Sequence, residues 1–188
     1  MRTLAAVVCS LLVVLCVGTV EAGSPTVPVT VAMQKSGSEA TLLGMFFHDH
    51  QLGWAVGSGG TILKTTDGGH KWKKVSSGTS SLLTAVYFRD AKRGWVVGAN
   101  GTVRTSKDGG ETWSVVVVST QAPLYGIAFA SPTKGWMVGG NGTILQTTDG
   151  GENWIDQASG TSAALYAIAL TNELQGTAVG ALGTILTT

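Results

Sequence analysis

An eight-residue motif occurs three times in this chain at a constant spacing. It reads Ser/Thr-x-Asp-Gly-Gly-x-x-Trp, and its copies span residues 65–72, 106–113 and 147–154. The three aspartates, Asp67, Asp108 and Asp149, follow one another at intervals of 41 residues. A motif that returns at such a period indicates repeated structural units, each of which buries its apolar surface against its neighbours. The sequence therefore predicts a chain built from structural units of 41 residues each.

The repetition extends beyond the motif and predicts four short strands in each unit. A shift of 41 residues aligns GWAVG, GWVVG, GWMVG and GTAVG, and then GTIL, GTVR, GTIL and GTIL. In the second unit the predicted strands are residues 83–88, 94–98, 102–106 and 112–118. Asn100-Gly101 and Asn141-Gly142 predict tight hairpins, because both residue types tolerate positive φ. No segment after residue 23 has helical periodicity, so essentially no helix is expected.

Units of this length with four antiparallel strands are typical of β-propeller blades. The predicted fold is all-β, a propeller of about four 41-residue repeats in one domain of residues 23–188. Residues 26–34 align with a fourth strand, whereas residues 165–188 supply only three strands. The N-terminal segment could complete the C-terminal blade and close a four-blade ring. Alternatively, the chain is part of a larger propeller, whose open sheet edges would favour aggregation or a dimer.

The N-terminus has the pattern of a secretory signal peptide. Arg2 precedes an apolar run over residues 4–20, and Val20-Glu21-Ala22 supplies the small residues of a cleavage site. Residues 1–22 are therefore predicted to be removed, which places the protein in the secretory pathway or outside the cell. An uncleaved membrane anchor is the alternative, since residues 4–20 are at the short limit for a span. Both cysteines, Cys9 and Cys16, lie in this run, so the mature domain has no thiol.

Composition and motifs exclude several classes of function. Charged residues make up 12% of the chain and the formal net charge is +1, so neither nucleic acid nor an anionic membrane is expected as a partner. The chain has no phosphate-binding loop, nucleophile elbow or zinc motif. His48 and His50 flank Asp49 and could present two imidazoles, but a solvated turn is the favoured interpretation. No metal or cofactor is expected.

The repeated motif resembles the Asp-box, also called the bacterial neuraminidase repeat. That resemblance implies an aspartate bonded to amides of its own turn and a tryptophan packed in the blade interior. The residue chemistry agrees, since aspartate readily accepts from amides two or three residues on and Gly-Gly permits positive φ. A structural role is therefore predicted for Thr65, Asp67, Gly69 and Trp72, for Ser106, Asp108, Gly110 and Trp113, and for Thr147, Asp149, Gly151 and Trp154. A second tryptophan set, Trp54, Trp95 and Trp136, is expected to pack between blades.

Asp-boxes also occur in sialidases and some glycoside hydrolases, so a carbohydrate-active protein is the alternative to a binding module. A sialidase needs an arginine cluster, but only Arg89, Arg93 and Arg104 follow the signal segment. A glycosidase needs two facing carboxylates, and the remaining acidic residues lie at positions that vary between units. A non-enzymatic protein is therefore predicted.

Basic residues fall into two predicted groups. Arg89, Lys92, Arg93 and Lys134 lie in the turns between first and second strands and are predicted to bind a partner on one rim. A second group, predicted near the opposite end of the blades, comprises Lys64, Lys71, Lys73, Lys74 and Lys107. Asn100 and Asn141 each begin an Asn-Gly-Thr sequence, which matches the N-glycosylation acceptor.

The order GW-x-VG, GTIL and then TTDGG-x-x-W resembles the photosystem II stability/assembly factor family over essentially the whole mature chain. This resemblance implies a non-enzymatic Asp-box propeller, typically of seven blades, in the thylakoid lumen or outside a bacterial cell. It also implies a protein partner, a newly made reaction-centre protein, bound partly through an arginine-rich patch. In this chain only Arg89 and Arg93 lie where such a patch could form.

Overall fold

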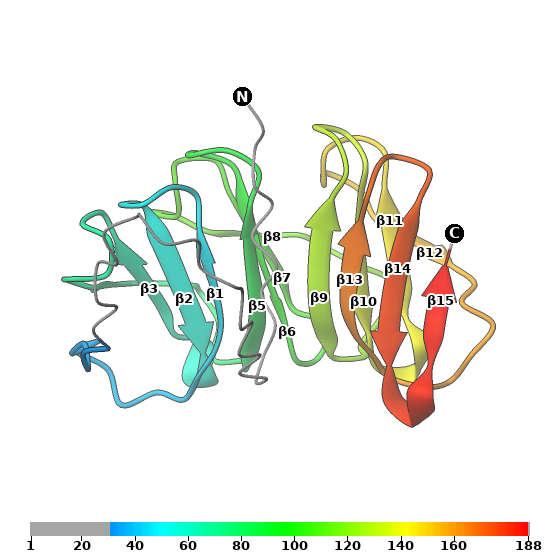
Figure 1. Cartoon of the computed structure of the whole chain (residues 1–188), viewed down its shortest axis with the longest axis horizontal. Helices are drawn as coiled ribbons and strands as arrows, with labels where there is room; N and C mark the ends of the chain where they lie inside the picture. The colour runs from blue at the N-terminus through cyan, green and yellow to red at the C-terminus, as the bar shows by residue number, and fades with distance from the viewer. Residues whose placement is uncertain (1–30, 188) are drawn as a thin grey trace, which may run out of the picture.

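The computed structural model describes residues 31–187, which form four antiparallel sheets side by side in chain order (Figure 1). We number the sheets as blades. Blade 1 contains β1 (Leu42–Phe47), β2 (Gly53–Gly57), β3 (Ile62–Thr65) and β4 (Lys73–Val75). Blade 2 contains β5 (Leu83–Phe88), β6 (Gly94–Gly98), β7 (Val103–Ser106) and β8 (Ser114–Val115). Blade 3 contains β9 (Leu124–Phe129), β10 (Gly135–Gly139), β11 (Ile144–Thr147) and β12 (Ile155–Gln157). Blade 4 contains β13 (Leu165–Leu170), β14 (Gly176–Gly180) and β15 (Ile185–Thr187).

Each blade is a meander in which consecutive strands pair, as the repeat predicts. The predicted strands 83–88 and 94–98 are confirmed as β5 and β6, and every residue of β6 is buried. The predicted outer strand 112–118 is shorter, because β8 covers only Ser114–Val115. An outer strand pairs along one edge only. The amide of Val116 still donates to the carbonyl of Val103 at 3.1 Å, but Val117 is 86% exposed and lies outside the strand.

The hairpins between second and third strands have the expected backbone. Asn100 and Asn141 have φ angles of 56° and 54°, the left-handed values that the Asn-Gly pairs predict. In blade 4 the residue at this position is Leu182, and its φ is 55°. A large side chain is disfavoured in this left-handed conformation. The prediction of essentially no helix needs a small correction, since three 3-10 turns of three residues close hairpins: η1 (Ser58–Gly60), η2 (Gly140–Gly142) and η3 (Ala181–Gly183). Within residues 31–187 no helix is long and apolar enough to cross a membrane.

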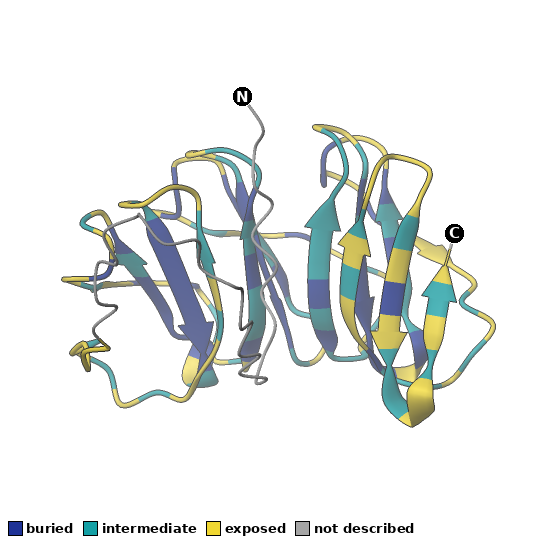
Figure 2. Ribbon diagram, viewed as in Figure 1, coloured by how far each residue is buried: buried dark blue, intermediate teal, exposed yellow. Residues whose placement is uncertain are grey.

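The apolar core lies between consecutive blades and has three parts. Trp54, Val56 and Ile62 of blade 1 pack with Leu83 and Phe88 of blade 2. The second part joins Val97 and Val103 of blade 2 to blade 3, and the third joins Val138 of blade 3 to Leu165 and Ala178 of blade 4. Buried residues accordingly dominate β2 and become sparse in blade 4 (Figure 2). Apolar contacts with the neighbouring blades therefore supply most of the buried core of each blade.

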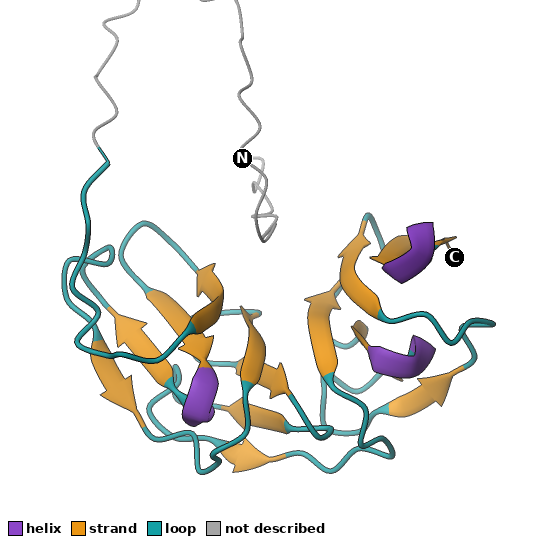
Figure 3. Ribbon diagram, turned by 90° about the horizontal axis from the view of Figure 1, so that it is seen from below, coloured by secondary structure: helices purple, strands orange, loops and turns teal. Residues whose placement is uncertain are grey.

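The four blades form an open arc rather than a closed ring (Figure 3). The inner strands β1, β5, β9 and β13 contact one another in sequence. Blade 4 has three strands, and described residues 31–34 belong to no strand. Val31 and Met33 are 97% and 99% exposed. The predicted completion of blade 4 by residues 26–34 is thus wrong for residues 31–34, whereas residues 26–30 and the signal peptide predicted for residues 1–22 lie outside the described residues.

Candidate functional site: the Asp-box rim

Each Asp-box forms a hydrogen-bonded turn between the third and fourth strands of its blade. In blade 2, Ser106 Oγ donates to Asp108 Oδ1 and accepts from the amide of Gly110, both at 2.8 Å. Asp108 Oδ1 also accepts from the amides of Glu111 and Thr112, both at 3.0 Å. The hydroxyl and the carboxylate thus satisfy backbone N–H groups that a tight turn would leave without partners.

The other two boxes use the same atoms. Thr65 Oγ1 donates to Asp67 Oδ1 at 2.9 Å in blade 1, and Thr147 Oγ1 donates to Asp149 Oδ1 at 2.8 Å in blade 3. The amides of Gly69 and Gly151 donate to these hydroxyls, each at 2.9 Å. All three boxes therefore form the same hydrogen-bonded turn. That these turns stabilise the fold stays a prediction, which mutation can test.

The hydrogen bonds keep the box carboxylates ionised. The hydroxyl and amide of Thr112, followed by the Ser106 hydroxyl, lower the pKa of Asp108 to about 2 despite an opposing effect of burial. The amide and side-chain amide of Asn153 similarly lower the pKa of Asp149 to about 2. A general acid needs a proton to donate at the working pH, so these carboxylates are unsuited to that role at neutral pH.

The box tryptophans pack inside their own blades. Each lies edge-on to the phenylalanine that ends the first strand of the same blade. Ring centroids are 6.1, 5.8 and 5.8 Å apart in the pairs Trp72–Phe47, Trp113–Phe88 and Trp154–Phe129. Trp113 and Trp154 also pack in the apolar clusters that lie between consecutive blades. The box thus attaches its turn to the apolar core on one side of its blade.

The second tryptophan set connects each blade to the next Asp-box. Trp54 lies flat on Phe88 of blade 2, with ring centroids 3.4 Å apart and an interplanar angle of 7°. Its Nε1 donates to the carbonyl of Gly109 at 3.1 Å. A Cβ on Gly110 would lie 2.5 Å from Trp54 Nε1, so this box position has room only for glycine. The inter-blade packing predicted for this tryptophan is therefore observed.

At the junction of blades 2 and 3, arginine replaces part of this contact. Trp95 stacks on Phe129 with ring centroids 4.4 Å apart, but its Nε1 has no partner among the described residues. Arg93 Nη2 instead lies 3.5 Å from the carbonyl of Gly150. The guanidinium carbons of Arg89 and Arg93 lie 5.9 and 5.7 Å from the Trp95 ring, within the range of a cation–π interaction.

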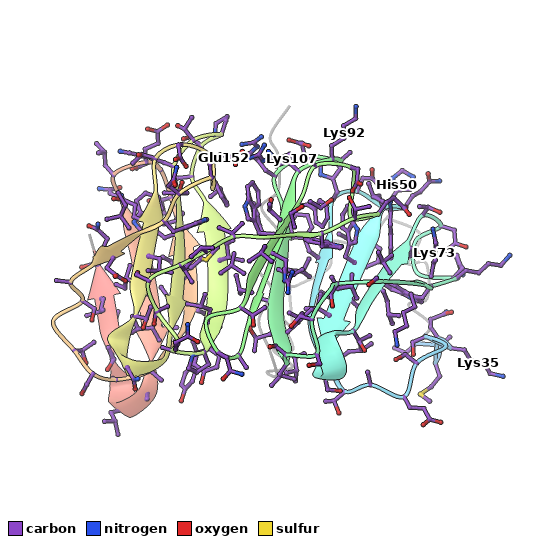
Figure 4. All side chains as sticks on the ribbon, turned by 180° about the vertical axis from the view of Figure 1, so that it is seen from behind. Lys35, His50, Lys73, Lys92, Lys107 and Glu152 are labelled. Atoms are coloured by element: carbon purple, nitrogen blue, oxygen red, sulfur yellow. The ribbon has the colours of Figure 1, made fainter. Side chains whose placement is uncertain are left out.

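The box turns share one end of the blades with the turns that follow the first strands. The amide of Gly109 donates to the carbonyl of Lys92 at 2.8 Å, and blades 1 and 3 have the equivalent bond. We call this end the Asp-box rim. Figure 4 shows Lys92, Lys107 and Glu152 together at this end, with Lys35 at the other. Placing Lys64, Lys71 and Lys107 at the opposite end from Lys92 was therefore wrong. Lys64 directly precedes a box turn, whereas Lys71 and Lys107 lie within one, and the third strand of a meander ends where the second begins.

Three of the four basic residues predicted to bind a partner reach the following blade. Arg89 donates to the carbonyl of Pro132, Arg93 pairs with Glu152, and Lys134 Nζ lies 3.5 Å from the carbonyl of Glu173. The fourth, Lys92, is exposed on the rim. The arginines are therefore held partly buried between blades, while Lys92 is accessible to a partner.

Two glutamates on this rim were missed by the sequence reasoning. Glu111 lies 2.8 Å from Lys64 and 3.0 Å from Lys73 of the preceding blade, and these lysines lower its pKa. Glu152 accepts from Arg93 and lies 3.2 Å from Lys107, both in blade 2. Both glutamates immediately follow the Gly-Gly of a box. This shared position is the sequence signal that could have identified them as partners of basic residues in the preceding blade.

A shallow, open depression lies on the outer side of the first junction. Its volume is about 220 Å³, and it is lined by Lys64, Thr66, Asp67, Lys71, Trp72, Lys73 and Glu111. No cluster of three or more metal-ligating side chains was found among residues 31–187. Asp49, between the two histidines, accepts from the amides of Gln51 and Leu52, each at 2.7 Å. Its carboxylate therefore closes its own turn.

Two other predicted features lie away from the rim. Asn100 and Asn141 are exposed at hairpin tips, and their glycosylation stays a prediction. Arg104, which occupies a position held by leucine in the other blades, donates through Nη2 to the carbonyl of Gly78 at 2.8 Å. This contact anchors the segment that connects blade 1 to blade 2.

Comparisons with known proteins identify the family. The profile described as "Photosynthesis system II assembly factor YCF48" matches residues 28–124 and 117–188. A search of curated proteins gave no match. A solved structure of YCF48 bound to a D1 peptide superposes with a TM-score of 0.66 and 26% identity, over 79% of this chain and 50% of that chain. YCF48 from Cyanidioschyzon merolae superposes with a TM-score of 0.67 and 22% identity, over 78% of this chain and 50% of that chain.

Other neighbours share the fold alone. The computationally designed Ika4 protein has a TM-score of 0.68 at 17% identity, over 84% of this chain and 98% of that chain. A GH74 enzyme from Niastella koreensis has a TM-score of 0.62 at 15% identity, over 76% of this chain and 26% of that chain. This chain spans about half the length of the YCF48 structures that it matches. Because the family profile covers most of the sequence, the predicted resemblance is confirmed, and the chain belongs to the photosystem II assembly factor YCF48 family.

Proposed function

We propose that this protein is a non-enzymatic scaffold that binds a segment of a reaction-centre protein during photosystem II assembly. The observation that carries the proposal is the family match, together with the relative at 26% identity that was solved with a D1 peptide. The work of such a protein is to hold an exposed peptide segment, which needs a surface and no reacting groups.

The Asp-box rim over the junction of blades 2 and 3 is the surface that best suits this role. Lys92 and Lys107 are exposed there, beside the two arginines stacked near Trp95. Glu152 offsets part of this positive charge. Fixed guanidinium groups with mobile lysines around them suit a peptide that presents carboxylates, because charge-assisted hydrogen bonds are stronger than neutral ones.

The compartment proposed is the thylakoid lumen or the secretory pathway, reached after removal of residues 1–22. Sequencing the N-terminus of the protein recovered from its native compartment tests this. A mature chain that begins at Gly23 supports cleavage of the signal peptide. A chain that retains residues 4–20 and fractionates with membranes would favour the anchored alternative.

Fluorescence anisotropy with a labelled D1 peptide tests the binding surface. We expect Lys92→Glu and Lys107→Glu each to weaken binding by roughly tenfold, about 1.4 kcal/mol, by placing a carboxylate opposite the peptide's own. Lys74→Glu in the outer strand β4 is the matched control and should leave affinity unchanged. Equal losses for all three variants would show a general charge effect and contradict the proposed surface.

A carbohydrate-active function is the second candidate, favoured only by the fold shared with GH74 enzymes. In the depression beside Glu111, the lysines lower the pKa of that glutamate, whereas a glycosidase's general acid requires a raised pKa. Release of reducing sugar from a panel of polysaccharides, abolished by Glu111→Gln, would overturn the non-enzymatic proposal.

A further inference from the structure

Glu152 spans the junction between blades 2 and 3 with only one of its two carboxylate oxygens. Its Oε1 accepts from Arg93 Nη2 and lies 3.2 Å from Lys107 Nζ, both in blade 2. Its Oε2 accepts no hydrogen bond from the part of the chain that the structure describes. At the first junction, Glu111 uses one oxygen for each of two lysines, at 2.8 and 3.0 Å. Glu152 is thus the less completely paired of two equivalent glutamates.

The second junction also presents more N–H donors than the protein satisfies. One edge of a guanidinium offers parallel N–H groups from Nε and a terminal nitrogen, which a single carboxylate can accept together. Glu152 accepts from Nη2 of Arg93, whereas Nε is buried without a partner among the described residues. Trp95 Nε1 is buried in the same way, although Trp54 Nε1 at the first junction has the Gly109 carbonyl. Unpaired buried donors are costly, so this junction suits a further acceptor.

Glu152 can leave Arg93 without disturbing the turn on which it lies. The turn is closed by Asp149, which accepts from the amides of Glu152 and Asn153, both at 3.0 Å. The carboxylate of Glu152 accepts only from side chains within residues 31–187, and its side chain is 49% exposed. An ion pair this open to water is weak, because water solvates both charges. Exchange of this carboxylate for another is therefore opposed by little free energy.

The resident group is a carboxylate at neutral pH. The hydrogen bonds from Arg93 and Lys107 lower the pKa of Glu152, so it is ionised there. Figure 4 shows Glu152 with Lys107 at the Asp-box rim, where a peptide has access. An ionised internal group on this edge repels an incoming carboxylate until it moves aside.

We propose that Glu152 closes the binding edge of Arg93 in the free protein and that a carboxylate of the bound peptide displaces it. This inference rests on the proposed function, since it concerns how the same rim binds the same peptide. The incoming carboxylate accepts from both Nε and Nη2 of Arg93, while Glu152 turns into solvent. A ligand without a carboxylate leaves Arg93 paired with Glu152. Glu152 therefore lowers the affinity for all ligands and selects those that can exchange with it.

Glu111 provides a matched control for Glu152. Both glutamates follow the Gly-Gly of a box, both lie at a junction between two described blades, and their side chains are 46% and 49% exposed. The partners of Glu111 are lysines, which lack the planar fork of arginine. Loss of either carboxylate changes the charge of the rim equally, but only loss of Glu152 frees an arginine edge.

Fluorescence anisotropy with the labelled D1 peptide tests the exchange. We expect Glu152→Gln to lower the dissociation constant by about fivefold, because a neutral amide holds Arg93 less tightly than a carboxylate does. Glu111→Gln should leave the constant within about twofold of the unaltered value. Equal gains in the two variants would show an effect of rim charge alone and overturn the proposal. Thermal unfolding of each variant verifies that it is folded.

Arg93→Lys tests whether the guanidinium edge is the group that is exchanged. Lysine keeps the charge without the fork, so adding Glu152→Gln to Arg93→Lys should change the dissociation constant by less than about twofold. A fivefold gain that persists in this background overturns the assignment to Arg93.

The same titrations separate this inference from the proposed function. If the unaltered protein binds the D1 peptide and Glu152→Gln binds it no more tightly, the inference fails alone. If neither protein binds the peptide, the proposed function fails and the inference fails with it. Amidation of the peptide's carboxyl groups should remove the gain from Glu152→Gln, and a gain that remains would contradict the exchange.

Discussion

The junction between blades 1 and 2 differs from the junction between blades 3 and 4, although both come from the same repeat. In the first, Trp54 is fully buried, stacks on Phe88 and bonds the next box. In the second, Trp136 is only half-buried, and Leu170 stands at the position of Phe88. The comparison indicates that a tight junction needs a tryptophan on one blade and a phenylalanine on the next.

Replacing Trp54 and Trp136 should produce the largest difference in stability between the two junctions. We expect Trp54→Ala to lower the free energy of unfolding by about 3–5 kcal/mol, because it leaves a cavity and removes a buried hydrogen bond. Trp136→Ala should cost roughly 1–2 kcal/mol, since less apolar surface is buried there. Urea unfolding followed by circular dichroism measures both values. Equal losses would contradict the proposed role of the aromatic pair.

Loss of a box aspartate should have the next largest effect. Asp108→Ala removes the acceptor of two exposed turn amides, which water replaces in part, and should cost about 0.5–1.5 kcal/mol. Asp156→Ala removes one exposed hydrogen bond, from Ser119, and serves as the control. The measurement is the midpoint of thermal unfolding. An Asp108→Ala protein that melts with the unaltered one would rule out the box as a stabilising turn.

Acid should weaken the blades that have intact boxes. Asp108 and Asp149 have pKa values of about 2 in the folded protein, against an unperturbed value of 3.8. A lowered carboxylate pKa contributes stability that is fully present above the unfolded value and is lost as pH falls through the folded value. Unfolding free energy should therefore decline from about pH 4 to about pH 2. An Asp108→Asn, Asp149→Asn protein should show a shallower decline, and an unchanged slope would point to other carboxylates.

The ion pairs across the first junction should matter least. Glu111→Gln removes the partner of Lys64 and Lys73, and an exposed pair of this kind contributes about 0–1 kcal/mol. The loss should disappear at high salt, which screens the unaltered pair. Urea midpoints measured at low and high salt test this. A loss that persists at high salt would mean that Glu111 acts through packing rather than charge.

Much of the single blade was predictable because its signals are local. Periodicity located β5 and β6, Asn-Gly pairs located the hairpins, and the spacing of Ser106, Asp108 and Gly110 indicated a self-bonded turn. The predicted partner cluster was less accurate. Arg89 and Arg93 were placed on the rim without the blade that they contact, because their acceptors lie about one repeat further along the chain.

The sequence by itself determined the period, the strand order within each blade, the box turns and the family. These follow from short-range chemistry, in which each residue meets others of its own repeat. Only the tertiary structure decided that Trp54 donates a hydrogen bond to the box of the following blade, that Lys107 lies on the same rim as Lys92, and that the four blades form an open arc. Those outcomes depend on the angle between blades, which the packing of side chains from two repeats determines together.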